Sequence, residues 1–265
     1  MSGTAMPLEG KTVVVSGVGP GLGARVVAAC VRDGARVALG ARTEERLPKV
    51  AEEVDPGGER TAWRPTDIAD EAQCEALAAL ALDRFGRIDA VVHVAALDSH
   101  FGGLADADFA SWARVVDINL FGTLRMTRAC LPALKRDGGS VVLIGTQSSS
   151  AAPTELRQTA YAASKGALTS AMYALARELG PHRIRVNTVQ PGWMWGPPVQ
   201  AYVTFTAQTE GVGEAEVLSR LTDRMALPEL ATDGDVAEAA AFLASDRARA
   251  ITGQSLLVNA GELMR

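Results

Sequence analysis

Residues Lys11–Gly23, with the sequence KTVVVSGVGPGLG, decide the fold. The part Lys11–Ser16 is a short β-branched run, which predicts a buried strand. Glycines follow at once, and Leu22–Asp33 then carries apolar residues at helical spacing. In this order of strand, turn and helix, a pyrophosphate can approach the free N–H groups of a helix N-terminus. The residues expected around it are Gly17, Gly19, Gly21, Leu22 and Gly23. The alternative is a glycine-rich turn that holds no ligand.

Strands and helices alternate along the rest of the chain. Further strands are predicted at 35–40, 60–64, 89–95, 140–145, 183–189 and 255–258, and helices at 43–54, 70–85, 106–136 (in two parts), 159–179 and 233–244. This alternation implies right-handed βαβ crossovers and a parallel sheet with helices on both faces. No linker or repeat divides the sequence. We therefore expect one α/β domain over residues 1–265, a Rossmann-like, doubly wound sheet of about seven strands.

The composition excludes several classes of partner. Of the 265 residues, 48% are hydrophobic and 22% are charged, which suffices for a globular core. The net charge is −5 and no long Lys/Arg run is present, so neither nucleic acid nor an anionic membrane is an expected partner. No apolar run approaches the length of a membrane span, and Met1–Gly10 lacks the features of a secretory signal.

The cysteines Cys30, Cys74 and Cys130 lie far apart, and no CxxC or Cys/His cluster accompanies them. Their positions predict reduced, buried thiols rather than disulfides or metal ligands. Together with the missing secretory signal, they predict a cytoplasmic protein without a metal site.

The end of the second predicted strand bears on the choice of dinucleotide. An acid there would hold the ribose 2′-OH of NAD, but this chain has Ala41–Thr43 with Arg42 at its centre. A guanidinium suits a phosphate, which favours NADP(H). The glycine-rich turn has no second basic residue, so NAD(H) stays open, and Arg42 has a solvated helix-entry position as its alternative. Asp67, beside Ile68, is placed to accept from the adenine amino group or to cap the next helix.

Tyr161 and Lys165 stand four residues apart in the predicted helix 159–179. That spacing puts both side chains on one face. A lysine ammonium beside a phenol favours the phenolate, which would lower a tyrosine pKa of about 10 toward neutrality. The pair is therefore a candidate acid/base device, and its alternative is an exposed helix face.

Over residues 8–261 the chain resembles the short-chain dehydrogenase/reductase family. The matching positions are Ser16-Gly17-x-x-x-Gly21-x-Gly23, Asp67, Asn119, Tyr161-x-x-x-Lys165, Pro191-Gly192 and Ile251-Thr252-Gly253-Gln254. The resemblance implies hydride transfer between nicotinamide C4 and a carbonyl or carbinol carbon, by a ketone or carbonyl reductase or a secondary-alcohol dehydrogenase. It also implies that Tyr161 passes the proton, that Lys165 lowers its pKa and binds the ribose hydroxyls, and that Asn119 holds a relay water through its backbone.

The family also has a serine that hydrogen-bonds the reacting oxygen, and two residues compete for that position. Counting back about thirteen residues from Tyr161 reaches Ser148. Extending the fifth predicted strand instead puts Thr146 at its end. A small loop insertion would explain the difference. Either hydroxyl can donate to a substrate oxygen, and Ser149 is a weaker third candidate.

The chain departs from the family pattern at two places. His93-Val94-Ala95-Ala96 replaces the usual Asn-Asn-Ala-Gly, which leaves the cofactor contact to the backbone at Ala95. His93 itself is expected to be a hydrogen-bonded structural residue, with titration near the site as the alternative. After Pro191 and Gly192 the usual threonine is missing, so backbone groups near Met194 are expected to bind the carboxamide.

Residues 193–228 are expected to form a helical lid over the substrate. The segment contains the aromatic residues Trp193, Trp195, Tyr202 and Phe205. These predict a pocket for an apolar or cyclic substrate, or else they pack the lid on the sheet or form a subunit contact.

Three further functions stay open on the same fold: epimerisation, dehydration and imine reduction. A non-catalytic nucleotide sensor is a fourth, although the complete Tyr161, Lys165 and Asn119 set argues against it. The resemblance also implies a homotetramer or homodimer, with the last strand and the helix 159–179 as contact elements.

Overall fold

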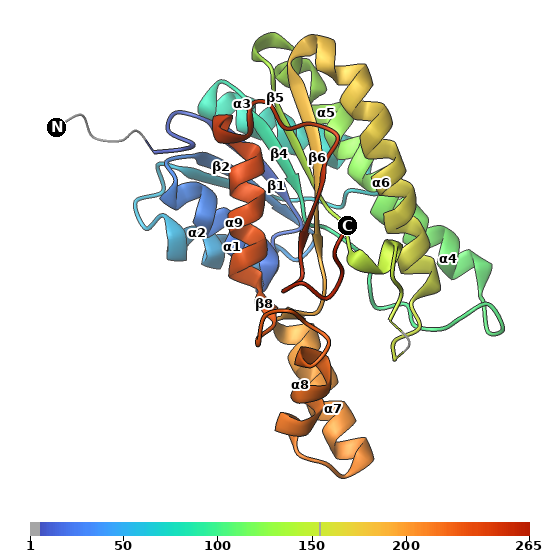
Figure 1. Cartoon of the computed structure of the whole chain (residues 1–265). Helices are drawn as coiled ribbons and strands as arrows, with labels where there is room; N and C mark the ends of the chain where they lie inside the picture. Colours follow the sequence, from blue (N-terminus) through green and yellow to red (C-terminus); the bar gives the residue numbers. More distant parts are fainter. Residues whose placement is uncertain (1–5, 154) are drawn as a thin grey trace.

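A computed structural model describes residues 6–153 and 155–265. Its centre is a seven-stranded sheet with the order β3-β2-β1-β4-β5-β6-β9 (Figure 1). Every pairing in this sheet is parallel, and the strand order reverses between β1 and β4. The predicted doubly wound architecture is confirmed. The strands are β1 (Thr12–Ser16), β2 (Arg36–Ala41), β3 (Thr61–Pro65), β4 (Ala90–His93), β5 (Gly139–Ile144), β6 (Ile184–Pro191) and β9 (Ser255–Val258).

Helices cover both faces of the sheet. One face packs against α1 (Leu22–Arg32), α2 (Leu47–Val54) and α9 (Asp233–Ala244), and the other against α3 (Glu71–Phe85), α5 (Thr123–Asp137) and α6 (Thr159–Leu179). Strand β1 contributes to the apolar core on both faces, because successive side chains of a strand point to opposite faces of the sheet. Val13 and Val15 join the first apolar core and Val14 joins the second. A strand buried on both faces reads as the continuous β-branched run seen in the sequence.

Several helix limits differ from the sequence prediction, for example the start of α4 at Phe109 instead of 106, and three differences concern how the chain enters or crosses a helix. The side chain of Asp70, not of Asp67, caps α3 by accepting the Gln73 N–H. The helix predicted at 43–54 begins as a 3₁₀ turn, Glu44–Arg46, and the Thr43 side chain caps nothing. Between α4 (Phe109–Val116) and α5 the chain stays helical through a π-helical turn, Asp117–Gly122, where the sequence predicted a junction between two helices.

Residues 193–232 form an extension that projects beyond the sheet (Figure 1). It consists of β7 (Met194–Trp195), α7 (Pro197–Glu210), α8 (Glu214–Thr222) and β8 (Ala231–Thr232), and β7 pairs with β8. The Trp193 ring is buried and packs on Tyr202 with 5.0 Å between centroids, whereas Phe205 is 68% exposed. These aromatics pack the extension itself or face solvent, so the predicted aromatic-lined pocket is not formed by them.

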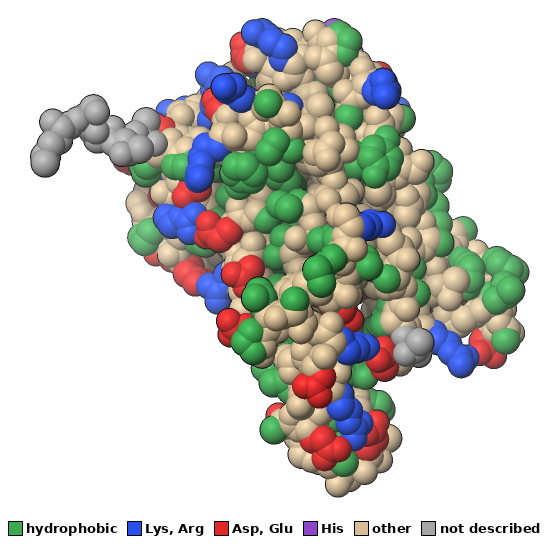
Figure 2. All heavy atoms as spheres, in the orientation of Figure 1, with side chains coloured by type: hydrophobic (Ala, Val, Ile, Leu, Met, Phe, Trp, Pro, Cys, Tyr) green, Lys and Arg blue, Asp and Glu red, His purple; other side chains and the backbone are tan. Residues whose placement is uncertain are grey.

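The surface of the extension carries charges of both signs (Figure 2). Arg220 on α8 forms ion pairs with Glu210 of α7 and with Glu216, which lies four residues earlier on α8. Such mixed, exposed pairs contribute little to stability, typically under about 1 kcal/mol each.

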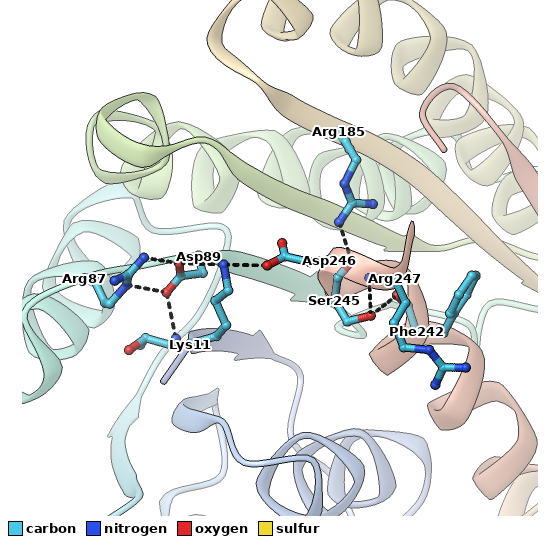
Figure 3. Close-up of polar contacts among 9 residues, drawn as sticks. Lys11, Arg87, Asp89, Arg185, Phe242, Ser245, Asp246 and Arg247 are labelled. Atoms are coloured by element: carbon cyan, nitrogen blue, oxygen red, sulfur yellow. Dashed lines mark hydrogen bonds and ion pairs between the residues drawn. The ribbon is translucent and has the colours of Figure 1, made fainter. Parts of the chain in front are cut away.

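Charged side chains are closely paired where the strands begin (Figure 3). Asp89, just before β4, is 6% exposed and accepts the Thr12 N–H at 2.9 Å and the Arg87 Nε–H at 2.8 Å. Lys11 Nζ lies 3.1 Å from Asp246 Oδ2 and 3.8 Å from Asp89 Oδ1. This cluster ties the beginnings of β1 and β4 together.

The thiols of Cys30, Cys74 and Cys130 are free and buried, as predicted. Burial raises the pKa of Cys30 to about 12 and that of Cys74 to about 11. Among the helices of residues 6–153 and 155–265, none has the length and apolar character needed to cross a membrane.

Candidate active site

A cavity of about 440 Å³ opens where the parallel strands end. Its position beyond the carboxyl ends of β1 and β4 is the one expected for a ligand in a doubly wound sheet. Among its lining residues are Gly17, Gly19, Gly21, Leu22, Arg42, Asp67, Ile68, Ala95, Tyr161, Lys165, Pro191 and Met194. Most of the residues singled out in the sequence therefore surround one cavity.

The glycine-rich turn lies in close contact with the backbone after β4. Ser16 O accepts both the Val94 and the Ala95 N–H. A Cβ on Gly17, whose φ is +92°, would lie 2.1 Å from the Ala95 N, and one on Gly23 would lie 2.3 Å from the Gly17 O. Gly23 thus shapes the turn from behind without lining the cavity. No side chain caps the start of α1, so an anion can use its free N–H groups.

Two arginines border the cavity beyond β2. Arg42 was expected from the sequence, but Arg46 was missed. Both are exposed, and neither forms an ion pair within residues 6–153 and 155–265. Arg42 lies in the bend after β2 and Arg46 ends the 3₁₀ turn Glu44–Arg46, so no shared helix face in the sequence pointed to the second arginine. Asp67 lines the same end, and its Oδ1 accepts the Ala69 N–H at 3.0 Å.

Asn119 joins the cavity wall to α6 from a buried position in the π-helical turn. Its Oδ1 accepts the Leu97 N–H at 2.7 Å, and its Nδ2 donates to Leu97 O at 3.1 Å and to Ser164 Oγ at 2.9 Å. Its own carbonyl accepts from Thr123 Oγ1 at 3.0 Å. Single π-helical turns are frequent at functional sites because they redirect side chains within a helix.

Tyr161 and Lys165 lie in the first turns of α6. Lys165 is only 2% exposed, and its Nζ donates to Ile144 O at 2.7 Å and lies 5.9 Å from the centre of the Tyr161 ring. Burial lowers the pKa of Lys165 to about 8, opposed by the charge of Asp98.

The same burial, followed by the charge of Asp98, raises the pKa of Tyr161, while a hydrogen bond with Thr146 lowers it. The sequence predicted a net fall caused by the lysine. That prediction is wrong for this conformation, because desolvation of the phenol dominates and the ammonium is directed at Ile144 O.

Thr146 is a buried residue two positions beyond the end of β5, and its side chain acts on the Tyr161 phenol by lowering the pKa of that group. Its Oγ1 also accepts the Ser148 N–H at 3.2 Å. Ser148 and Ser149 lie on the 3₁₀ turn that follows, and Ser149 Oγ donates to the Thr146 carbonyl at 2.8 Å. Of the candidate hydroxyls, Thr146 is the one placed against the phenol.

Comparison with known proteins supports a family assignment. Residues 17–262 match a family model described as enoyl-(acyl carrier protein) reductase. L-rhamnose 1-dehydrogenase (NAD(P)(+)) of Azotobacter vinelandii is 33% identical over 260 residues, which cover 97% of this chain and 98% of that protein. The chain belongs to the short-chain dehydrogenase/reductase family.

Further relatives agree with this assignment. L-fucose dehydrogenase of Bos taurus is 32% identical over 252 residues, covering 95% of this chain and 89% of that protein. A short-chain type dehydrogenase/reductase from Mycobacterium ulcerans superposes with a TM-score of 0.86 at 30% identity, covering 96% of this chain and 90% of that one. A structure from Brucella melitensis, described as a short-chain dehydrogenase/reductase of the glucose/ribitol dehydrogenase type, gives 0.85 at 29% identity, covering 99% and 100%.

Short-chain dehydrogenases/reductases use nicotinamide cofactors, and the cavity fits one. A side chain on Gly17 would collide with the Ala95 backbone, so this glycine lets the two loops approach, whereas the Cβ position of Gly19 has no atom within 4 Å and leaves room for a ligand. The uncapped start of α1 suits the pyrophosphate, and the cavity continues from Arg42 to Tyr161. Both ends of a dinucleotide would therefore meet suitable groups.

His93, where the family usually has asparagine, is buried and does not line the cavity. Because the Thr127 hydroxyl donates to Thr123 O, it accepts from His93 Nε2, 2.9 Å away. The other ring nitrogen, Nδ1, lies 3.2 Å from Ser16 Oγ. Burial, and then the charge of Lys165, lower the pKa of His93 to about 3. The neutral ring is thus a structural link between β1 and α5.

At two positions of this short-chain dehydrogenase/reductase the cavity lining differs from the sequence prediction. Gly192 packs against Gln147 and Asn259 and does not line the cavity, unlike its neighbours Pro191 and Met194. Asp98 lines the cavity beside Tyr161 and was missed, because no motif of the sequence contains it.

Proposed function

We propose that this protein is a nicotinamide-dependent dehydrogenase or reductase that transfers hydride between the cofactor and the carbinol or carbonyl carbon of a small cyclic substrate. The observation that carries the proposal is the continuity of one cavity. It borders the glycine-rich turn Gly17–Leu22 at one end and Tyr161 with Lys165 at the other. A cofactor spanning it would bring its reactive ring to the tyrosine.

Each residue of the chain then has a chemical task. The bound cofactor would accept or supply the hydride. Tyr161 would take the proton of the substrate hydroxyl in oxidation and return it in reduction. Thr146, whose side chain already acts on the pKa of the phenol, would donate to the substrate oxygen. Lys165, with a pKa of about 8, would stabilise the phenolate when it is charged.

Asn119 would act through position rather than by contact with substrate. Its side chain fixes the backbone at Leu97 and the hydroxyl of Ser164, one residue before Lys165. Its carbonyl would be the group that holds the water of the proton relay. This role rests on the family resemblance and on the buried geometry of the π-helical turn.

The cofactor proposed as preferred is NADP(H). Arg42 and Arg46 provide two guanidinium groups at the adenosine end of the cavity, and Arg46 supplies the second basic residue that the sequence lacked in the turn. NAD(H) is the competing ligand, and the rhamnose dehydrogenase relative is named for both cofactors. A fluorescence titration with NADPH and NADH tests the preference directly.

The substrate proposed is ring-sized, because the named relatives act on L-rhamnose and L-fucose. The extension 193–228 would cover it as a lid. The apolar character expected from the sequence loses its support, since Trp193 and Tyr202 pack on each other. Epimerisation, dehydration, imine reduction and a sensor without turnover remain the alternatives.

Self-association as a homodimer or homotetramer is proposed on exposed apolar residues. Phe109, Phe121 and Tyr173 are exposed on α4, the π-helical turn and α6, and Leu256 is exposed on the edge strand β9. Light scattering tests this, and a stable monomer at working concentration would contradict it.

A steady-state assay tests the proposed function. The protein is supplied with NADP⁺ or NADPH and with a panel of cyclic alcohols, sugars and ketones, and nicotinamide absorbance is followed. We expect turnover that needs Tyr161. A protein that binds NADPH but changes the absorbance with no member of the panel would favour the sensor or a non-redox reaction.

A further inference from the structure

Asp98 places a carboxylate in the cavity at the reacting end. It lies beyond β4, lines the same cavity as Tyr161 and Lys165, and is exposed. Within residues 6–153 and 155–265, its carboxylate has no hydrogen-bond or ion-pair partner. Its two oxygens are therefore available to a ligand that enters the cavity.

The backbone around Asp98 is held in place from two sides. The preceding residue, Leu97, is bound through both its N–H and its carbonyl by Asn119. The carbonyl of Asp98 accepts from Gln158 Nε2 at 2.5 Å, and Gln158 directly precedes α6. The carboxylate is thus carried on a segment fixed to the π-helical turn and to the start of α6, the helix that holds Tyr161 and Lys165.

Asp98 is close enough to affect both reactive groups electrostatically. Its charge is the second cause, after burial, of the raised pKa of Tyr161, and it partly offsets the effect of burial on the pKa of Lys165. Because Asp98 and Tyr161 line the same cavity, a substrate whose oxygen is bonded to Tyr161 lies in the cavity that this carboxylate faces. An ionised carboxylate only accepts hydrogen bonds, so a matching substrate must carry donors there.

We propose that Asp98 binds a hydroxyl of the substrate next to the carbinol that reacts, and so selects polyhydroxylated rings over monohydroxy alcohols and anionic substrates. This inference rests on the proposed dehydrogenase function. A neighbouring sugar hydroxyl donates to the carboxylate in a charge-assisted bond. A substrate carboxylate at the same place would be repelled.

The test compares a sugar and a plain ring alcohol in the wild type and in Asp98→Asn. L-fucose and L-rhamnose serve as polyhydroxylated probes and cyclohexanol as the monohydroxy probe. The measured quantity is kcat/KM for the sugar divided by kcat/KM for cyclohexanol. A change in Tyr161 alone alters both values equally and therefore leaves their ratio unchanged. We expect this ratio to fall by about ten- to a hundredfold, the size of a lost hydrogen bond to a charged group.

Asp106→Asn is the matched control, since it removes the same charge from an exposed position that does not line the cavity. It should leave the ratio unchanged. Asp98→Asn should also leave the Kd of NADPH unchanged and shift the pH profile of cyclohexanol oxidation to lower pH, because the pKa of Tyr161 then falls.

Three results would overturn the inference. The first is an equal loss for sugar and cyclohexanol, the second is weaker NADPH binding in Asp98→Asn, and the third is a wild type that oxidises cyclohexanol but neither sugar. In each case the nicotinamide-dependent activity stands. The proposed function fails separately, when the wild type oxidises none of the three probes and reduces no ketone with either cofactor.

Discussion

The two ends of the central sheet differ in how their charged side chains are paired. Where the strands begin, the buried carboxylate of Asp89 has Arg87, Lys11 and a backbone N–H as partners (Figure 3). Where they end, and among the described residues, the hydrogen-bond partner of the buried Lys165 ammonium is a carbonyl oxygen, and the Asp98 carboxylate has no partner. Both ends belong to the same strands, so the fold itself does not impose the difference.

The comparison separates stability from function. A buried charge with its partners in place is costly to disturb, because removing one partner leaves the other desolvated. A charge that lacks a protein partner at a strand end is instead available to a ligand, and perturbed pKa values concentrate at such sites. Substitutions at the two ends should therefore affect different measurements.

The largest effect is expected from Tyr161→Phe. Turnover should fall by about a thousandfold, within the range of lost general acid–base catalysis, while the Kd of NADPH and the free energy of unfolding stay nearly unchanged. Steady-state kinetics, a fluorescence titration and urea unfolding measure the three quantities. Tyr173→Phe is the control, because this tyrosine lies on the same helix and is 53% exposed. Wild-type turnover in Tyr161→Phe would remove the tyrosine from the proposed chemistry.

Asp89→Ala tests the opposite end. The free energy of unfolding should fall by about 3 kcal/mol, because Arg87 loses its bidentate partner and the Thr12 N–H loses its acceptor. The Kd of NADPH should not change. Asp246→Ala, at a side chain that is 76% exposed, should cost under about 0.5 kcal/mol in the same urea titration. Equal losses in the two variants would show that the cluster is not a stabilising unit.

The cofactor preference gives an intermediate effect. Arg42→Ala and Arg46→Ala should each weaken NADPH binding by about tenfold and NADH binding much less, since each removes a charge-assisted bond to the 2′-phosphate. Arg36→Ala removes the same charge at the opposite end of β2 and should change neither affinity. If NADH binds as tightly as NADPH in the wild type and the variants, the proposed preference is refuted.

The smallest effect concerns acid stability. The pKa of His93 is about 3 in the folded protein and about 6.5 in the unfolded chain. Between these two pH values only the unfolded chain binds the proton, which favours unfolding. The free energy of unfolding should therefore fall as the pH is lowered through 6.5, by about 1 kcal/mol between pH 7 and pH 5.5. His93→Asn should reduce this slope, and His182→Asn, at an exposed residue, should retain it.

Much of the architecture could be predicted because it depends on local pattern. The limits of α6, α9 and β9 were predicted to the residue, since periodicity and flanking glycines or turns mark them. The choice between Thr146 and Ser148 could not be made, because a loop insertion changes the count but not the strand end.

Other parts of the site depend on distance across the fold, which sequence spacing does not contain. Asp98 and Arg46 reach the cavity through the path of the backbone after β4 and β2. The direction of the Tyr161 pKa shift was also mispredicted, because the local pair suggested a charge effect while burial, a tertiary property, is the larger cause.

The buried thiols have a practical consequence for labelling experiments. Cys30, Cys74 and Cys130 are free and buried, and burial keeps them as unreactive thiols at neutral pH. A maleimide dye should therefore modify the native protein only as fast as the chain opens. A single cysteine introduced on the exposed face of α7, for example at Phe205, could then be labelled selectively, and its fluorescence would report movement of the extension when ligands bind.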